Sequence, residues 1–391
     1  MTSRERFLKV LAGEMPDRVP VTLFILDQGN FLNQVYPDVD AQDFLALQLK
    51  VIELQRQLNV DVFVRPFYGL ADPLCIAEEC GLIVSQQTEN WDVHTEELRR
   101  DNTVLWRTTI RTPDGTLTQD VSRTEIRPGS FVYACPRKPI KTRADLEMAI
   151  QYEPRMPESF KKHARNWIQR IKAALGDSGI IGTWGPQGTF NTAASLVDHE
   201  QLYMLFLIDY PFYERLMTFA VERMRDWLRA YDAAGVDVHC MGGNVPGGFL
   251  GRQTYDRYIL PFEKKLIDIA QEHGTPAMYH NCGQVMALVE SYKQLGVRIV
   301  EPFSPPPLGD ANLEQVKRMV GDAYVILAGI DQVNVLQKGT IDQVKRATAA
   351  TMKAGKPGGR FIMQPADLLE YGTPLENIEA YVETAMQFAG Y

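Results

Sequence analysis

The stretch Pro276-Ala277-Met278-Tyr279-His280-Asn281-Cys282-Gly283 is an apolar run that ends in a His-x-Cys-Gly motif. The apolar residues predict a short buried strand, which is followed by a helical pattern over 285–295 and a second apolar run over 298–300. A strand, a helix and a further strand in this order are typical of a parallel sheet. Because residues i and i+2 of an extended segment project to the same side, the unit also places His280 beside Cys282.

The alternation of helix and strand continues on both sides of this unit. Further strands are predicted over 180–184, 236–241, 325–327 and 361–363, with helical segments between them. About eight strands and no Gly-rich dinucleotide-binding fingerprint favour a closed α/β barrel of the TIM-like (β/α)8 type over an open, doubly wound sheet. In such a barrel the carboxyl ends of the strands share one rim, so we expect His280, Cys282 and Glu301 to lie together.

One segment departs from this alternation. Over residues 91–127 the pattern changes to period 2, and the runs 104–110 and 116–118 flank the turn signal Pro113-Asp114-Gly115. We therefore expect a β-hairpin inserted into a single barrel domain that spans residues 1–391. The simplest interpretation of the hairpin is a lid or an ornament of the rim without a chemical role.

The composition is that of an ordinary globular protein and argues against several classes of protein. Of the 391 residues 45% are hydrophobic and 23% charged, and the net charge of -8 disfavours nucleic acid or an anionic membrane as a partner. No apolar run approaches the ~18 residues that a membrane span needs, and the polar N-terminus is not a signal peptide. The 5 cysteines have no regular spacing, which indicates reduced thiols in a soluble, cytoplasmic protein.

His280 and Cys282 are a candidate metal site. A thiolate beside an imidazole suits zinc better than magnesium or calcium, although a buried histidine and a packed cysteine would give the same pattern. Glu301 directly follows an apolar run and precedes Pro302, so we expect its carboxylate at the barrel mouth. Cys240, at another predicted strand end, is either a further ligand or a packed thiol.

Aromatic and loop residues near the predicted rim are candidates for binding a substrate. The loop after Trp184 is rich in glycine and proline, which suits the close approach of a ligand to the backbone. Aromatic side chains in this region could form an apolar slot for a planar ring, although each is also a plausible core residue. The candidate substrate-binding residues are Tyr68, Trp184, Gln187 and Phe190.

Motifs in several parts of the chain resemble the uroporphyrinogen decarboxylase superfamily. They are Arg4-Glu5-Arg6-Phe7-Leu8, Pro16-Asp17-Arg18-Val19-Pro20, Leu327-Ala328-Gly329-Ile330-Asp331 and Gly372-Thr373-Pro374. The resemblance covers nearly the whole chain. It implies a modified (β/α)8 barrel with a deep cleft at the carboxyl ends of the strands.

The His-x-Cys-Gly motif resembles the zinc methyltransferase branch of this superfamily. Enzymes of that branch move a methyl group between a substrate and the cobalt of a corrinoid protein, and they bind zinc through His-x-Cys and, usually, a later Cys. In this chain Asp367 stands where the later Cys is expected. The resemblance thus implies His280 and Cys282 as ligands, with Asp367, Glu301 or Cys240 as the third; a carboxylate is an acceptable zinc ligand.

From this resemblance we expect a zinc-dependent methyltransferase that moves a methyl group from a small methoxylated, aromatic compound to a corrinoid (cobalamin) cofactor. A carboxylate in place of a thiolate makes zinc more electrophilic, which suits ether cleavage, and Glu301 and Asp367 are the candidate catalytic residues. We expect a separate protein to carry the corrinoid, on the premise that this chain lacks a cobalamin-binding Asp-x-His-x-x-Gly segment. The enzyme itself is expected to be a monomer or a homodimer.

Three alternatives remain open. One is transfer of a methyl group from a methyl-corrinoid to a thiol or to tetrahydrofolate. Another is a metal-free decarboxylase, but the decarboxylases of the superfamily carry arginines after the Arg-Val-Pro strand. Residues 24–30 here contain one acid and no arginine, which disfavours an anionic tetrapyrrole as substrate. The third alternative is a binding protein on an enzyme scaffold.

Overall fold

The structure is a computed structural model that describes residues 1–26, 31–40, 43–66, 81–127, 130–185, 187–243, 245 and 247–391. The strands are β1 (Val62–Val64), β2 (Asp92–Arg100), β3 (Thr103–Thr112), β4 (Gly115–Arg127), β5 (Ser130–Arg137), β6 (Gly179–Ile181), β7 (His239–Gly242), β8 (Ala277–His280), β9 (Ile299–Glu301), β10 (Val325–Ala328) and β11 (Phe361–Met363). The helices are α1 (Ser3–Ala12), α2 (Phe31–Val35), α3 (Phe44–Gln57), α5 (Arg143–Tyr152), α6 (Glu158–Leu175), α7 (Thr189–Leu196), α8 (His199–Ile208), α9 (Tyr210–Ala234), α10 (Gly247–Thr254), α11 (Leu260–Ala270), α12 (Val289–Tyr292), α13 (Leu313–Val320), α14 (Ile341–Gly355) and α15 (Leu375–Ala389). In the part of the chain that is described, none of the helices has the length and apolar character needed to cross a membrane.

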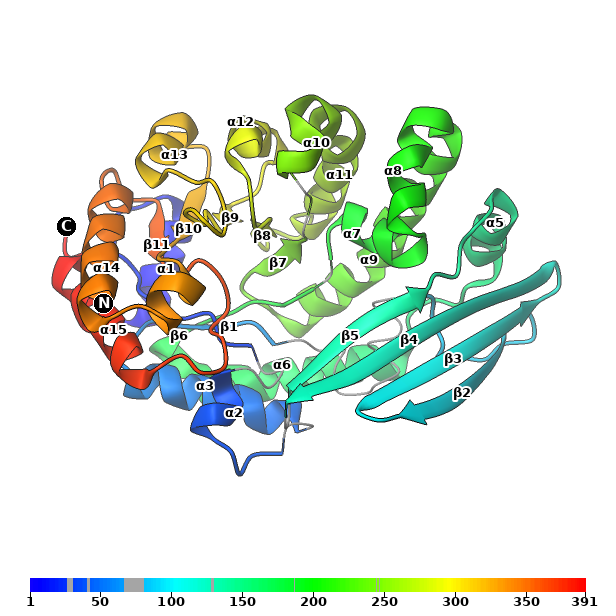
Figure 1. Cartoon of the computed structure of the whole chain (residues 1–391), viewed down its shortest axis with the longest axis horizontal. Coiled ribbons are helices and arrows are strands. Elements are labelled where there is room, and N and C mark those ends of the chain that lie inside the picture. The colour runs from blue at the N-terminus through cyan, green and yellow to red at the C-terminus, as the bar shows by residue number, and fades with distance from the viewer. Residues whose placement is uncertain are drawn as a thin grey trace.

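Strands β1 and β6 to β11, together with one extended segment, form a parallel ring (Figure 1). Five strands pair in the order β11-β10-β9-β8-β7, β1 pairs with β6, and a bridge from Gly182 to Val238 joins the two groups. The extended segment bridges Met363 through Val21, whose carbonyl oxygen accepts a hydrogen bond from the backbone of Asp61, next to β1, at 2.7 Å. Backbone pairing therefore runs round the whole ring, which confirms the expected (β/α)8 barrel.

The hydrophobic core has an inner and an outer layer. The inner layer fills the barrel with side chains such as Phe63, Met278 and Leu327, and α1 closes one end with Phe7 and Val10. The outer layer lies between the ring and the surrounding helices. Because helices cover the ring, the barrel strands are buried on both faces, and this is why continuous apolar runs identified them in the sequence.

The motifs near the N-terminus stabilise the end of the barrel where its strands begin. The buried carboxylate of Asp61 accepts hydrogen bonds from Arg6 Nη1 at 2.5 Å and Arg18 Nη1 at 2.6 Å. Arg4 makes a two-pronged pair with Asp237, at 2.6 and 2.8 Å. These charges precede β1 and β7 in the chain, so they lie opposite the rim on which strand-end chemistry is expected.

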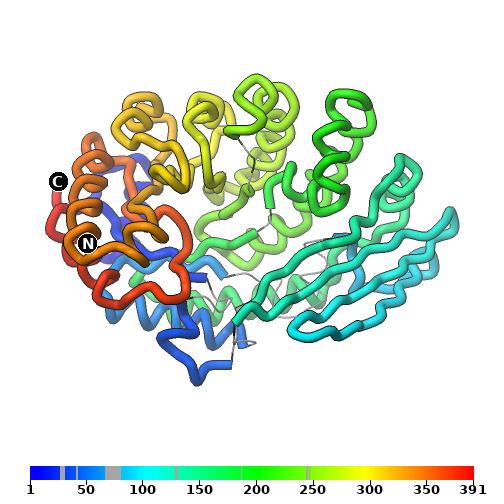
Figure 2. Tube along the Cα trace, in the orientation of Figure 1, coloured from blue at the N-terminus to red at the C-terminus, as the bar shows by residue number. Residues whose placement is uncertain are grey.

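The inserted segment is larger than the predicted hairpin. Strands β3 and β4 pair around residues 113–114 as expected, but β2 and β5 extend them to a 4-stranded antiparallel sheet in the order β2-β3-β4-β5. The expected end at residue 127 was therefore wrong, since the excursion continues to Arg137. In the sequence the pair Pro128-Gly129 is typical of the end of an element, so it hides this continuation. The sheet stands beside the barrel (Figure 2).

Candidate metal centre

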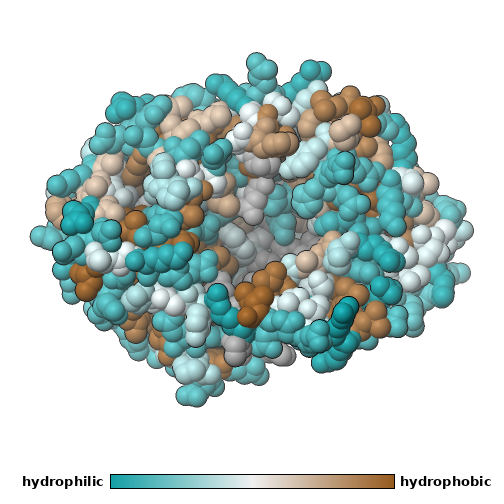
Figure 3. Space-filling view, in the orientation of Figure 1, coloured by the Kyte–Doolittle hydropathy of each residue, from teal (hydrophilic) through white to brown (hydrophobic). Residues whose placement is uncertain are grey.

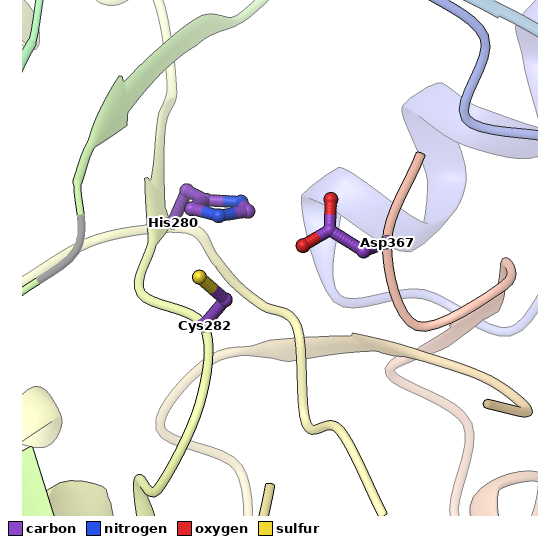
Figure 4. Close-up of side chains that lie close together, drawn as sticks. All are labelled: His280, Cys282 and Asp367. Carbon is purple, nitrogen blue, oxygen red and sulfur yellow. The ribbon is translucent and has the colours of Figure 1, made fainter. Parts of the chain in front are cut away.

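Three metal-ligating side chains meet at the carboxyl ends of the barrel strands. His280 ends β8, Cys282 lies two residues later, and Asp367 follows β11, which β9 and β10 separate from β8. One ligand atom from each residue can be chosen so that all lie within 4.8 Å of one another. Figure 4 shows the three side chains pointing toward a common space. The structure thus brings His280 and Cys282, which the motif named, together with Asp367, one of the three candidates for a third ligand.

Glu301 is not one of the three grouped residues, but it contacts one of them, His280. The two residues are neighbours in the register of β8 and β9, and Glu301 Oε1 lies 3.1 Å from His280 Nδ1. The same oxygen accepts a hydrogen bond from Arg65 at 2.6 Å, and Oε2 accepts one from Gln364 at 3.2 Å. Because both oxygens are engaged, Glu301 is suited to orient the imidazole and leave Nε2 for a metal rather than to bind the metal itself.

Arg65 is a candidate functional residue that the sequence analysis missed. Its side chain is 2% exposed and lies over the rings of Phe24 and Phe63, at 4.3 and 4.4 Å from their centroids. It donates hydrogen bonds to both Glu301 and Gln364. The signal was present, because Arg65 follows a buried strand and precedes a proline in the same way as Glu301.

The surroundings of Glu301 and His280 favour the charged forms of both side chains. Burial raises the pKa of Glu301, but the charge of Arg65 and the hydrogen bonds outweigh it and lower that pKa to about 2. Burial lowers the pKa of His280, whereas hydrogen bonds with Cys282 and Glu301 and the nearby negative charges raise it to about 10. Burial also raises the pKa of Asp367. Without a metal His280 therefore holds a proton at neutral pH, and a metal must displace it.

We therefore expect zinc affinity to rise with pH. Below the raised pKa of His280, about 10, each proton displaced strengthens apparent binding about tenfold per pH unit. The measurement is a competition titration against a chelator of known affinity at several pH values from about 6 to 9. An affinity that stays constant over this range, after correction for the chelator, contradicts a site that contains His280.

The predicted substrate-binding residues have different surroundings. The ring of Trp184 makes an edge-on contact with His280, with centroids 5.0 Å apart, so it borders the group. Gln187 is half-buried and its backbone bridges Gly242 at the end of β7. Phe190 is 2% exposed and packs against Tyr203 in the outer core layer, so its ring has almost no free face. Tyr68 lies outside the described residues.

Cys240 is a packed thiol inside the barrel. It is 1% exposed, and it belongs to the inner core layer together with Val238 and Met278. Burial raises its pKa to about 12, which disfavours the thiolate that a metal needs. Cys240 is also absent from the group formed by His280, Cys282 and Asp367. Of the three open candidates for a third ligand, the geometry therefore favours Asp367.

The premise about the cobalamin-binding segment was wrong, because Asp237-Val238-His239-Cys240-Met241-Gly242 has the spacing Asp-x-His-x-x-Gly. In the structure this segment forms β7 of the barrel and the residues just before it. His239 is 0% exposed, and its Nε2 lies 2.8 Å from Asp232 on α9. Asp237 pairs with Arg4. A histidine held in this way cannot reach a cobalt, so the spacing does not make a corrinoid site here.

The fold is a (β/α)8 barrel with polar side chains at the carboxyl ends of its strands, and comparison of the sequence with known families identifies a family with this fold. The chain belongs to the uroporphyrinogen decarboxylase family, whose sequence profile matches residues 130–388. A methyltransferase structure from Methanosarcina mazei superposes over 99% of both chains with a TM-score of 0.70. The two chains share 16% sequence identity, so this likeness shows the fold.

Two curated relatives are methyltransferases from Methanosarcina mazei. A methylated-thiol–coenzyme M methyltransferase is 28% identical over 144 residues, which are 37% of this chain and 36% of that protein. A methylcobamide:CoM methyltransferase, MtbA, is 25% identical over 141 residues, 36% of this chain and 38% of that protein. The matched part thus spans little more than a third of the length of either relative.

Proposed function

We propose that this protein is a zinc-dependent methyltransferase that works with a corrinoid. The observation that carries the proposal is the convergence of His280, Cys282 and Asp367 at the barrel mouth. The names of the two relatives, one of which includes a methylcobamide, support the same class of reaction. The thiol of Cys282 must stay reduced to bind a metal, which agrees with the cytoplasm as its compartment.

The side chains fit zinc in kind and in number. One nitrogen, one sulfur and one carboxylate oxygen are accepted zinc ligands, and three protein ligands are typical of a catalytic site that keeps one position open. Ligand atoms within 4.8 Å of one another need only a small closing movement to reach zinc distances of about 2.0–2.3 Å. Bound zinc would supply a Lewis acid that polarises a substrate oxygen or sulfur.

The remaining residues would position and insulate this centre. Glu301, kept ionised by Arg65, would hold the Nδ1 proton of His280 and so fix the imidazole that binds the metal. Trp184, packed against His280, would cover one side of the group and exclude water from it. Glu301 would thus act as a positioning residue, and Asp367 would be the carboxylate in contact with the metal.

Within this class we propose that the methyl donor is a methoxylated aromatic compound and that the acceptor is the corrinoid of a separate protein. The choice of an ether as methyl donor rests on Asp367. A ligand set with one thiolate and one carboxylate leaves zinc more electrophilic than a set with two thiolates. A more electrophilic metal suits an ether oxygen as leaving atom, whereas electron-rich sites suit activation of a thiol. The reverse transfer, from methyl-corrinoid to a thiol or tetrahydrofolate, is the alternative.

Exchange of Asp367 for cysteine separates the two directions. We expect Asp367→Cys to keep about one zinc per chain, because cysteine is a normal ligand. We expect it to lower the demethylation of methoxybenzene with free cob(I)alamin as acceptor by more than about tenfold, because the metal becomes less electrophilic. The measurements are zinc content and the optical change from cob(I)alamin to methylcobalamin. Unchanged or faster demethylation would contradict the assignment of Asp367 to ether activation, and Asp367→Ala serves as the variant that loses the ligand.

The wild-type assay tests the function itself. Zinc-loaded protein, incubated without oxygen with cob(I)alamin and methoxybenzene or 2-methoxyphenol, is expected to form methylcobalamin and the corresponding phenol. Removal of zinc should stop the reaction and its return should restore it. Formation of methylcobalamin only from a methylated thiol would refute the aromatic ether as methyl donor, and transfer from methylcobalamin to a thiol alone would establish the reverse direction instead.

A further inference from the structure

A hollow of about 310 Å³ opens beside Cys282. Its lining includes Gly247, Gly248, Phe249, Cys282, Gly283 and Gln284. It therefore lies between the loop at the start of α10 and the segment that carries the candidate metal ligand. None of the predicted substrate-binding residues is among these lining residues.

One wall of the hollow depends on glycines. A Cβ atom on Gly247 would lie 2.6 Å from the carbonyl oxygen of Gln284, and one on Gly248 would lie 1.8 Å from Gln284 Oε1. Both distances are far below normal contact; at Gly247 the neighbour is backbone, so a side chain there would push the two segments apart, and at Gly248 a side chain would displace the carboxamide of Gln284. The result is a wall of bare peptide with a carboxamide along it, and a flat molecule can lie close to such a surface.

Phe249 provides an aromatic surface at the edge of this wall. Its side chain is 78% exposed, and it meets Tyr203 of α8 edge-on with ring centroids 5.8 Å apart. Figure 3 shows hydrophobic side chains over the region of α8 and α10. A ring held by one neighbour and otherwise exposed can present its face to a flat ligand.

The hollow favours an uncharged ligand. Among its described lining residues none carries a charge, and Gln284 is the polar side chain that could bond to a ring substituent. No lysine, arginine or histidine is among these described residues to pair with an anionic group of a substrate. The volume falls at the lower end of the range of small-molecule sites, about 300–1,000 Å³, which fits a single substituted ring.

We propose that this hollow is the binding site for the ring of an uncharged aryl methyl ether and that Phe249 determines the preference for aromatic substrates. The inference rests on the proposed function, because it assumes that a methyl donor must reach the group that contains Cys282. The ring of the ligand lies against Phe249 and the glycine wall, and its methoxy group faces Cys282.

Binding measured without a corrinoid tests this inference separately from the function. The experiment is isothermal titration calorimetry of the zinc-loaded protein with methoxybenzene and with methoxycyclohexane, which has nearly the same shape but no π system. We expect the wild-type protein to bind methoxybenzene about tenfold more tightly, Phe249→Ala to lose this preference, and Phe249→Tyr to keep it. Leu207→Ala, on α8 and 67% exposed but absent from the lining, should match the wild type.

Several results would overturn the inference. They are equal affinity of the wild-type protein for the two ethers, no binding of either, or an unchanged preference in Phe249→Ala with its zinc content intact. Conversely, the expected binding pattern without any methyl transfer to cob(I)alamin would refute the proposed function and leave the site in place.

Discussion

Cys282→Ala is expected to lower bound zinc from about one ion per chain to less than about a tenth and to reduce methyl transfer at least about a thousandfold. Cys282 supplies the thiolate of the proposed site, and a nitrogen and a carboxylate left alone at the rim cannot hold zinc against the solvent. Zinc is measured by elemental analysis after gel filtration, and transfer by formation of methylcobalamin.

Cys135→Ala is the matched control for this substitution. Like Cys282, Cys135 forms no disulfide with another described cysteine, but it lies on β5 of the inserted sheet and is absent from the group of metal-ligating side chains. It should keep full zinc and activity. A Cys282→Ala protein that retains zinc and activity while its melting temperature is unchanged would show that Cys282 is not a ligand.

Arg65→Met is expected to lower the free energy of unfolding by about 3–5 kcal/mol. The side chains of Arg65 and Glu301 are each 1% exposed, and loss of the arginine leaves a buried carboxylate without its main partner. Urea denaturation measures the change. Without Arg65 the carboxylate of Glu301 is no longer fixed and no longer orients the imidazole of His280. Zinc affinity should therefore fall as well, by about 10- to 100-fold.

Arg215→Met controls for the loss of an ion pair as such. Arg215 pairs with Glu147 at 2.9 Å, a similar contact, but the two side chains are 48% and 56% exposed. Solvent screens such a pair, so its loss should cost less than about 1 kcal/mol. Equal and small effects of the two substitutions would contradict the buried network behind the metal group.

Most of the barrel could be predicted from the sequence because buried parallel strands have a simple signature. Strands such as β8 and β10 are covered on both faces, so each is a continuous apolar run between helices. The extent of the insertion could not be predicted in the same way. Its strands face solvent on one side and have mixed patterns, and in the sequence Pro128-Gly129 has the same signature as the end of an element.

The candidate metal centre was predictable in part. His280 and Cys282 follow from local spacing, since two residues of one extended segment suffice. The choice of Asp367 over Glu301 needed the structure, because both follow strands and only the register of β8 with β9 shows that Glu301 is taken up by His280 and Arg65. The hollow beside Cys282 was invisible in the sequence, because it depends on glycines that approach Gln284 from another strand end.

The proposed metal centre is tested by locating zinc with anomalous diffraction at the zinc absorption edge, from crystals of the zinc-loaded protein. We expect one peak per chain at bonding distance, about 2.0–2.3 Å, from His280 Nε2, Cys282 Sγ and a carboxylate oxygen of Asp367. His280 Nδ1 should remain on Glu301. No peak at this position, or a peak held by Cys240 or Glu301 in place of Asp367, would contradict the proposed metal centre.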